Sequence, residues 1–181
     1  MTLYTYKEAL ETYGSRSALT AQISRGKLFN VARNLYSEDQ YSDSLAQVMK
    51  LYPETVVTGL TAFYIYGLTD KVPVVIDLAT RRNATRISNP EVKQHFVDNS
   101  RFDVGVISVR HDGTMVRIYD LEMMLFYLVR NDGKLPLDLF REVLKSYRKR
   151  TDELDFGKLQ WYADLLPWGR KNLERIVKEL L

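Results

Sequence analysis

The feature that most constrains the fold is a change of hydrophobic period near the N-terminus. Residues 15–26, SRSALTAQISRG, have a helical pattern, because Leu19 and Ile23 lie four positions apart on one face. Residues 26–37, GKLFNVARNLYS, instead hold two β-prone runs, and Asn34 between them tolerates the left-handed backbone of a tight turn. The sequence therefore predicts a helix, with Leu19 and Ile23 buried, that leads directly into a β-hairpin.

A second helical segment precedes this pattern. Residues 5–14 place Tyr6, Leu10 and Tyr13 on one helix face, and Gly14 is a residue at which the helix can end. Two short helices separated by a tight turn and followed by a hairpin give the element order of a winged helix-turn-helix. We therefore predict a winged helix-turn-helix DNA-binding domain over residues 1–40.

The net charge of the chain is +3, and the whole excess lies in its first fifth. Residues 1–36 contain five basic and two acidic residues, whereas residues 37–181 contain 21 of each. A local positive field of this kind suits an anionic partner. A mildly basic surface without a partner is the alternative that charge alone leaves open.

The free face of the 15–26 helix is small, polar and flanked by arginine. Small side chains let a helix approach base edges in the major groove, and arginines at its margins reach phosphate or guanine. Basic residues at the base and tip of the hairpin suit the DNA backbone or the minor groove. The predicted DNA-contacting residues are Arg16, Ser17, Thr20, Ser24, Arg25, Lys27 and Arg33. The alternative is a solvated helix face beside an ordinary hairpin.

The rest of the chain mixes helical and strand patterns. We expect helices over 44–53, 58–68 (with Thr58 as its N-cap), 89–99, 120–133, 136–150, 155–166 and 167–181, a buried strand over 72–80, and a hairpin around the turn at 111–113. Residues 41–181 are thus predicted to form a mixed α/β domain that ends in helices. The expected fold class of the whole chain is α+β.

Two further basic clusters lie in this second domain. Arg81, Arg82 and Arg86 follow the expected strand, and Arg148, Lys149 and Arg150 end an expected helix. They are candidates for a basic surface that holds an anion or RNA. The alternatives are a solvated loop for the first cluster and compensation of the helix dipole for the second.

Several classes of chemistry lack support in the sequence. The chain has no cysteine, its two histidines lack metal-ligand spacing and are expected at the surface, and it has no glycine-rich phosphate loop. We therefore expect no enzyme activity, no metal and no cofactor. The N-terminus is polar, and the longest apolar run, 123–129, is far shorter than the roughly 20 residues that cross a bilayer. A soluble cytoplasmic protein with no membrane partner is expected.

Taken together, several segments resemble the AbiEi family, the antitoxins of bacterial type IV toxin–antitoxin systems that act in abortive infection. The segments that carry the resemblance are ISRGKLFNVARNLYS, TGLTAFYIYGLTD, IDLATRR, VRIYDLEMMLFYLVRNDGKLPLDLFREVLKSYRKR and DELDFGKLQWYA. The first is similar to the wing of the family, in which many members have glycine where this chain has Asn34. None is a catalytic signature, and their order and spacing carry the likeness over about nine-tenths of the chain.

The resemblance implies a function as well as a fold. It implies a winged helix-turn-helix that binds double-stranded DNA at inverted repeats in its own promoter and represses its operon, as a monomer or a dimer. It also implies an antitoxin domain at 41–181, whose functional partner is a nucleotidyltransferase-like toxin opposed without a required stable complex. The DNA-contact positions are those already reached from spacing.

Three alternatives stay open at this point. The first is a stand-alone winged-helix transcriptional regulator. The second is an antitoxin or interaction protein in which DNA binding is weak or lost, so that residues 81–86 or 145–150 matter more. The third is an enzyme acting on nucleotides, which no histidine or carboxylate constellation in the sequence supports.

Overall fold

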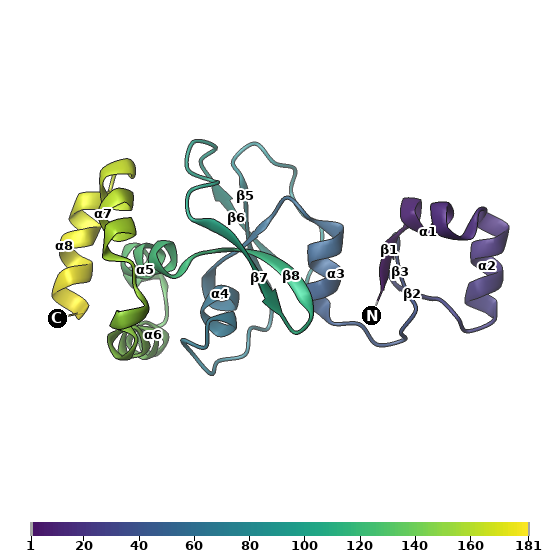
Figure 1. Ribbon diagram of the computed structural model, residues 1–181, viewed down its shortest axis with the longest axis horizontal. Helices are drawn as coiled ribbons and strands as arrows, with labels where there is room; N and C mark the ends of the chain where they lie inside the picture. Colours follow the sequence, from purple (N-terminus) through teal and green to yellow (C-terminus); the bar gives the residue numbers. More distant parts are fainter. Residues whose placement is uncertain (1, 181) are drawn as a thin grey trace. The chain divides into compact units, whose positions relative to one another are not determined.

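The computed structural model describes residues 2–180 and is mixed α/β, with eight α-helices and two sheets within that range (Figure 1). The chain divides into two compact units. The N-terminal unit comprises the residues up to Glu54 together with Gly113–Met115, and the second unit comprises Thr55–Asp112 and Val116–Leu181. The expected boundary at residue 40 falls inside the N-terminal unit, because the helix that follows it packs against the first strand.

The N-terminal unit is a small three-stranded sheet with helices. Its elements are β1 (Leu3–Thr5), α1 (Tyr6–Tyr13), α2 (Arg16–Ser24), β2 (Phe29–Ala32), β3 (Leu35–Ser37) and α3 (Ser44–Leu51). The strand order is β1-β3-β2, with both pairings antiparallel, so Tyr36 in the centre of β3 lies opposite Tyr4 on one side and Asn30 on the other. The two expected helices and the hairpin are confirmed, whereas β1 was not expected.

Local signals in the sequence set where α1 and α2 begin and end. Thr5 and Glu8 form a capping box at the start of α1, in which the Thr5 hydroxyl accepts the Glu8 N–H and the Glu8 carboxylate accepts the Thr5 N–H. Gly14 ends α1 with φ +86°, and Ser15 caps α2 through the Ala18 N–H at 3.1 Å. Asn34 has φ +60°, which confirms the left-handed turn residue expected in the hairpin.

The core of the N-terminal unit is small and partly aromatic. Ala9, Leu19, Leu28 and Tyr36 form a buried cluster. The side chains packed against this cluster are Tyr4, Leu10 and Tyr13. Leu19 is buried as expected, but Ile23 on the next turn of α2 is 37% exposed. The apolar stripe of α2 is therefore anchored at one point and reaches solvent at its C-terminal end.

The second unit combines a mixed sheet with a set of helices. Its strands are β4 (Val56–Val57), β5 (Ile76–Arg81), β6 (Val92–Val97), β7 (Val106–His111) and the larger part of β8 (Thr114–Tyr119). Its helices are α4 (Gly59–Ile65), α5 (Leu121–Arg130), α6 (Leu137–Lys149), α7 (Phe156–Leu165) and α8 (Gly169–Leu180), with 3₁₀ turns at Asp132–Lys134 and Thr151–Glu153. The strand order is β6-β5-β4-β8-β7.

Residues 89–99 correct one sequence expectation. A helix was expected there from Asn89-Pro90, yet the segment contains β6, which pairs in parallel with β5 over six residues. The Asn89 side chain accepts the Glu91 N–H, so it closes a turn into the strand instead of capping a helix. The local start signal was correct as a turn signal, but pairing with a buried strand decided the structure that follows.

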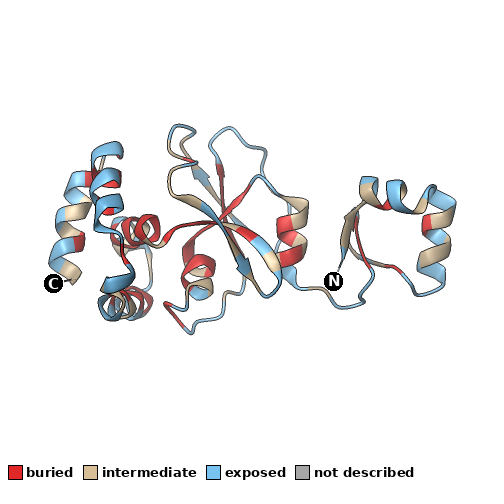
Figure 2. Cartoon of the chain, viewed as in Figure 1, coloured by how far each residue is buried: buried red, intermediate tan, exposed pale blue. Residues whose placement is uncertain are grey.

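Helix α5 is the centre of the helical part of the second unit. Seven of its ten residues are buried, and it packs against α4, α7 and α8 (Figure 2). Asp120 caps it through the Met123 N–H, and the other Asp120 carboxylate oxygen accepts the Tyr162 hydroxyl at 2.7 Å. Lys158 lies 3.3 Å from Asp120 and 3.7 Å from Glu122. These buried acids are thus paired, and they tie the start of α5 to α7.

Helices α7 and α8 meet at Gly169, where no side chain fits. A Cβ added to Gly169 would lie 2.6 Å from the Ala163 Cα atom, so backbone meets backbone at this point. Gly133, in the 3₁₀ turn after α5, has no heavy atom within 4 Å of such a Cβ. The two glycines therefore differ in packing while both lie in the same unit.

We predict that Gly169→Ala lowers the free energy of unfolding by roughly 2–3 kcal/mol, because the added methyl group must push two helices apart. Gly133→Ala is the matched control, and it is expected to be neutral or to stabilise by up to about 1 kcal/mol, because it only reduces the freedom of the unfolded chain. Urea unfolding followed by circular dichroism measures both. Equal effects of the two substitutions would contradict the packing argument.

Candidate functional site

Helix α2 presents the small polar face expected from its sequence. Ser17, Thr20 and Ser24 are exposed along one side, and Leu19 on the opposite side is only 2% exposed. The Thr20 hydroxyl donates to the Arg16 carbonyl oxygen at 2.9 Å, so its oxygen remains able to accept from a ligand. The helix is thus held by its buried face while an unobstructed face of short side chains reaches solvent.

Four exposed cations lie at the ends of α2 and on the hairpin segment that follows it. Arg16 begins α2, Arg25 follows its last residue, Lys27 precedes β2, and Arg33 lies in the turn between β2 and β3. All four are exposed, and within residues 2–180 none of them forms a salt bridge. Their charge is therefore not neutralised inside the unit and is free to attract an anion.

The Glu8 carboxylate of α1 is paired within the N-terminal unit. It accepts from Lys50 of α3 at 2.7 Å and from the Thr5 backbone N–H at 2.8 Å. The hydrogen bond from Lys50 and the one from Thr5 lower the pKa of Glu8 from 4.5 to about 2. Glu8, one of the two acids in residues 1–36, is thus engaged in holding α1 to α3.

The basic residues expected in the second unit divide into two groups. Arg81 binds Asp103 at 2.6 Å, Arg148 donates to the Glu179 carbonyl at 2.6 Å, and Arg150 binds Glu153 with two hydrogen bonds. These three side chains are occupied by contacts within the fold. The other three residues of the two predicted clusters have exposed side chains and no salt bridge to another described residue. They are Arg82, Arg86 and Lys149.

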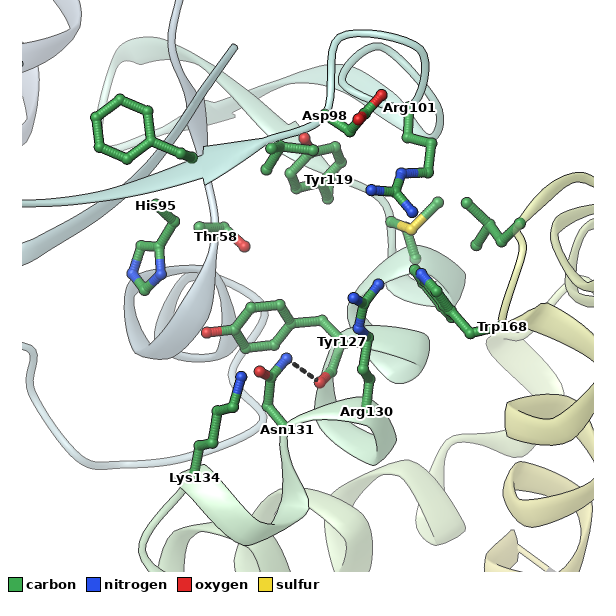
Figure 3. Close-up of a pocket in the computed structure, with 14 residues that line it drawn as sticks. Thr58, His95, Asp98, Arg101, Tyr119, Tyr127, Arg130, Asn131, Lys134 and Trp168 are labelled. Atoms are coloured by element: carbon green, nitrogen blue, oxygen red, sulfur yellow. Dashed lines mark hydrogen bonds between the residues drawn. The ribbon is translucent and has the colours of Figure 1, made fainter. Parts of the chain in front are cut away.

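The second unit also contains a cleft that sequence reasoning did not find. Its cavity has a volume of about 250 Å³ (Figure 3). It is lined by Thr58 before α4, by β6 and the turn after it, by the end of β8, by α5 and the 3₁₀ turn after it, and by the α7–α8 connection. The basic residues in its wall are Arg101, Arg130 and Lys134, and its aromatic residues are Phe96, Tyr119, Tyr127 and Trp168. These groups come from positions more than 70 residues apart, so no local spacing could have revealed them.

An aromatic contact holds Arg130 in the wall of the cleft. The Arg130 guanidinium lies 4.3 Å from the centre of the Trp168 ring, a cation–π contact, and Phe126 packs against the same indole. Partial burial, followed by the neighbouring charge of Arg101, lowers the pKa of Arg130 from its usual value. Asp98 is the acid in the wall, and its carboxylate accepts the Ser100 N–H and hydroxyl.

His95 corrects a second sequence expectation. It was expected at the surface, but its ring is 26% exposed and its Nε2 lies 2.6 Å from Asp77 Oδ1, while its edge meets Tyr127. Burial, and then the Asp77 charge, raises the pKa of Tyr127 to about 12, so its phenol is neutral at pH 7. The one signal for this arrangement was Asp77 itself, an acid within the apolar run VVIDLA.

The described part of the chain forms neither a cluster of metal ligands nor a membrane-spanning helix. Residues 2–180 contain no group of three or more His, Cys, Asp or Glu side chains placed to hold a metal ion. Among the same residues, every helix is too short or too polar to span a bilayer.

A scan against protein-family models and a search of curated proteins found no match to this chain.

We predict that Glu8→Gln lowers the stability of the N-terminal unit by about 1 kcal/mol at pH 7, a modest effect because both partners are partly exposed. The folded pKa lies below the unfolded value, so this stabilisation is present above pH 4.5 and is lost as the pH falls towards 2. Wild type and variant should therefore converge between those values. Hydrogen exchange of the α1 amides, compared at matched pH, measures this.

The matched control is Glu11→Gln on the same helix. Its carboxylate is 65% exposed and lies 3.9 Å from Lys7, so its removal is expected to change exchange little at any pH. A Glu8→Gln effect that stayed constant from pH 7 to pH 2.5 would show that charge is not the source of the stabilisation.

Proposed function

We propose that the N-terminal unit is a winged helix-turn-helix that reads double-stranded DNA, with α2 as the recognition helix and the β2–β3 hairpin as the wing. The observation that carries this proposal is the exposed face of short polar side chains on α2, together with four exposed cations on α2 and the following hairpin segment that form no salt bridge within residues 2–180. Phosphate contacts provide affinity for DNA, and base contacts from a helix in the major groove provide sequence preference.

The dimensions of the unit agree with this role. Helix α2 has nine residues and is therefore about 14 Å long, comparable with the roughly 12 Å width of the major groove. Arg16 and Arg25 lie at its two ends, where they can reach the phosphates on either side. Lys27 and Arg33 mark the start and the tip of the hairpin, so the wing can follow the backbone or enter the minor groove.

The wider proposal joins this module to an antitoxin. We propose that the chain is an autoregulating antitoxin of a type IV toxin–antitoxin phage-defence system, cytoplasmic and without enzyme activity, which represses its own operon. The resemblance of five ordered segments to the AbiEi family supports it. The second unit would then oppose a nucleotidyltransferase-like toxin, and its unpaired basic residues Arg82, Arg86 and Lys149 are candidates for that surface.

Fluorescence anisotropy on the DNA upstream of the gene tests the first part. The purified full chain is titrated against this duplex and against a scrambled duplex, across a series of salt concentrations. Specific binding that exceeds the scrambled control by about 1,000-fold or more would support a sequence-reading repressor. The slope of log K against log salt gives about 0.9 per phosphate contacted, and equal binding to both duplexes would exclude the proposal.

We predict that Arg25→Ala weakens operator binding about tenfold or more and lowers the salt slope by about one. Lys178→Ala is the matched control, because it removes one positive charge from an exposed position of α8 without touching the proposed interface. It should leave both quantities unchanged. If both variants lost affinity equally, net charge and not the α2 face would explain binding.

Toxin neutralisation tests the antitoxin part separately. Cells that express the toxin encoded beside this chain are complemented with the wild type, with Arg25→Ala and with an Arg82→Ala/Arg86→Ala double variant. Rescue by Arg25→Ala, with loss of rescue in the double variant at equal protein level, would place neutralisation in the second unit. Failure of the wild type to rescue would exclude the antitoxin proposal while leaving the DNA-binding result intact.

A further inference from the structure

The cleft of the second unit combines a basic end with an aromatic wall. Figure 3 shows Arg101 and Arg130 extending toward the same opening, with the Tyr127 ring beside Arg130 and Thr58 across from it. A cavity with this division suits a ligand that has an anionic group at one end and a flat ring at the other. All the lining residues belong to the second unit, so the site is independent of the proposed DNA-binding surface.

The charges at the opening are not balanced by the protein. Arg101, Arg130 and Lys134 form no salt bridge with any residue in the described range 2–180. Asp98 is the carboxylate in the lining, and the Ser100 N–H and hydroxyl already occupy one of its oxygens. Three cations therefore line the cleft with one acid, and partial burial, followed by the charge of Arg101, lowers the pKa of Arg130.

Two converging guanidiniums that form no salt bridge repel each other, and an anion between them removes that repulsion. Phosphate fits this geometry well, because a guanidinium donates two parallel hydrogen bonds to a pair of phosphate oxygens. Arg130 is already oriented by its stacking on Trp168, so little side-chain freedom is lost when it binds.

The remainder of the wall is apolar or aromatic. Met123 and Leu166 lie among the lining residues with Tyr119 and Tyr127. The Tyr119 hydroxyl donates to the Phe102 carbonyl, which fixes its ring, and the Tyr127 ring is held by edge contacts with Phe63 and His95. Rigid aromatic rings offer a planar base a stacking surface, as they do in many nucleic-acid-binding sites.

The size of the cavity limits the ligand. A volume of about 250 Å³ lies just below the 300–1,000 Å³ range usual for small-molecule sites. One base, one sugar and one phosphate match such a space, with part of the ligand left in the open mouth, whereas a dinucleotide is too large.

We propose that this cleft binds a nucleoside 5′-monophosphate, with the phosphate between Arg101 and Arg130 and the base against Tyr127. Lys134 also lines the cleft and adds positive charge without fixing the geometry. The phosphate then contacts the two arginines and the base contacts the tyrosine, so neither the phosphate nor the base alone accounts for the expected affinity.

Isothermal titration calorimetry of the full chain with AMP tests the proposal. The same protein is titrated with adenosine, with ribose 5-phosphate and with inorganic phosphate. We expect AMP to bind with a dissociation constant on the order of 10–100 µM, and each of the other three to bind at least about tenfold more weakly. No AMP binding, or inorganic phosphate binding as tightly as AMP, would overturn the proposal.

Variants locate the site. Arg101→Gln and Arg130→Gln are each expected to weaken AMP binding about tenfold or more. Arg110→Gln is the matched control, since it removes an exposed arginine of the same unit, on β7, that lies outside the cleft, and it should bind as wild type does. Tyr127→Leu should weaken AMP but leave the weak binding of ribose 5-phosphate unchanged.

Arg130 also packs on Trp168, so its loss could disturb the fold. Arg101 makes no such stacking contact, and thermal unfolding of each variant shows which of them retain wild-type stability. AMP binding that survived in a stably folded Arg101→Gln variant would place the ligand elsewhere and overturn the assignment.

Discussion

The second unit depends on one buried carboxylate, that of Asp77 near the start of β5. It is 7% exposed, its Oδ2 accepts the Leu60 N–H at the start of α4, and its Oδ1 receives His95 from β6 at 2.6 Å. Gly59 must be a glycine for this to work, since its φ is +57° and a Cβ there would lie 2.8 Å from the Asp77 carboxyl carbon. One acid thus joins a strand, the helix that packs on it and the neighbouring strand, and it positions His95 beside the cleft.

The same use of acids explains where positive charge remains. Asp120 and Glu122 form salt bridges that connect α5 to α7. Glu8 likewise connects α1 to α3, and Glu153 binds Arg150. The chain is nearly balanced in formal charge, yet many of its carboxylates work inside the units. Cations that have no such partner, on α2 and in the cleft, are therefore left to act on an outside anion even though the net charge is only +3.

Elements of the fold that depend on neighbouring residues could be predicted from the sequence, whereas those that depend on distant residues could not. The change of period at residue 26, Asn34 in the turn and the DG turn at 112–113 all depend on neighbours in the chain, and the structure contains the elements they predict. Thr58 occupies the N-cap position of α4 as expected, but its hydroxyl donates to Met124 Sδ and makes no capping hydrogen bond. The carboxylate that accepts the Leu60 N–H at the start of α4 comes from Asp77, 17 residues further along the chain. Strand β6 and the cleft also depend on residues that are distant in the sequence. Pairing with β5 determines that residues 92–97 form a strand, and the lining of the cleft comes from segments between Thr58 and Trp168.

The two candidate sites differ in shape in a way that separates their ligands. The α2 face is convex and made of short side chains, so it can lie against an extended surface such as a DNA groove but cannot enclose anything. The cleft is concave and lined by long basic and aromatic side chains, so it can surround a small anion but leaves no room for a duplex. A concave aromatic wall makes most contacts with a ligand that it encloses, whereas a convex helix makes most contacts with a groove that it enters. The two surfaces therefore suit different classes of molecule and need not compete for the same one.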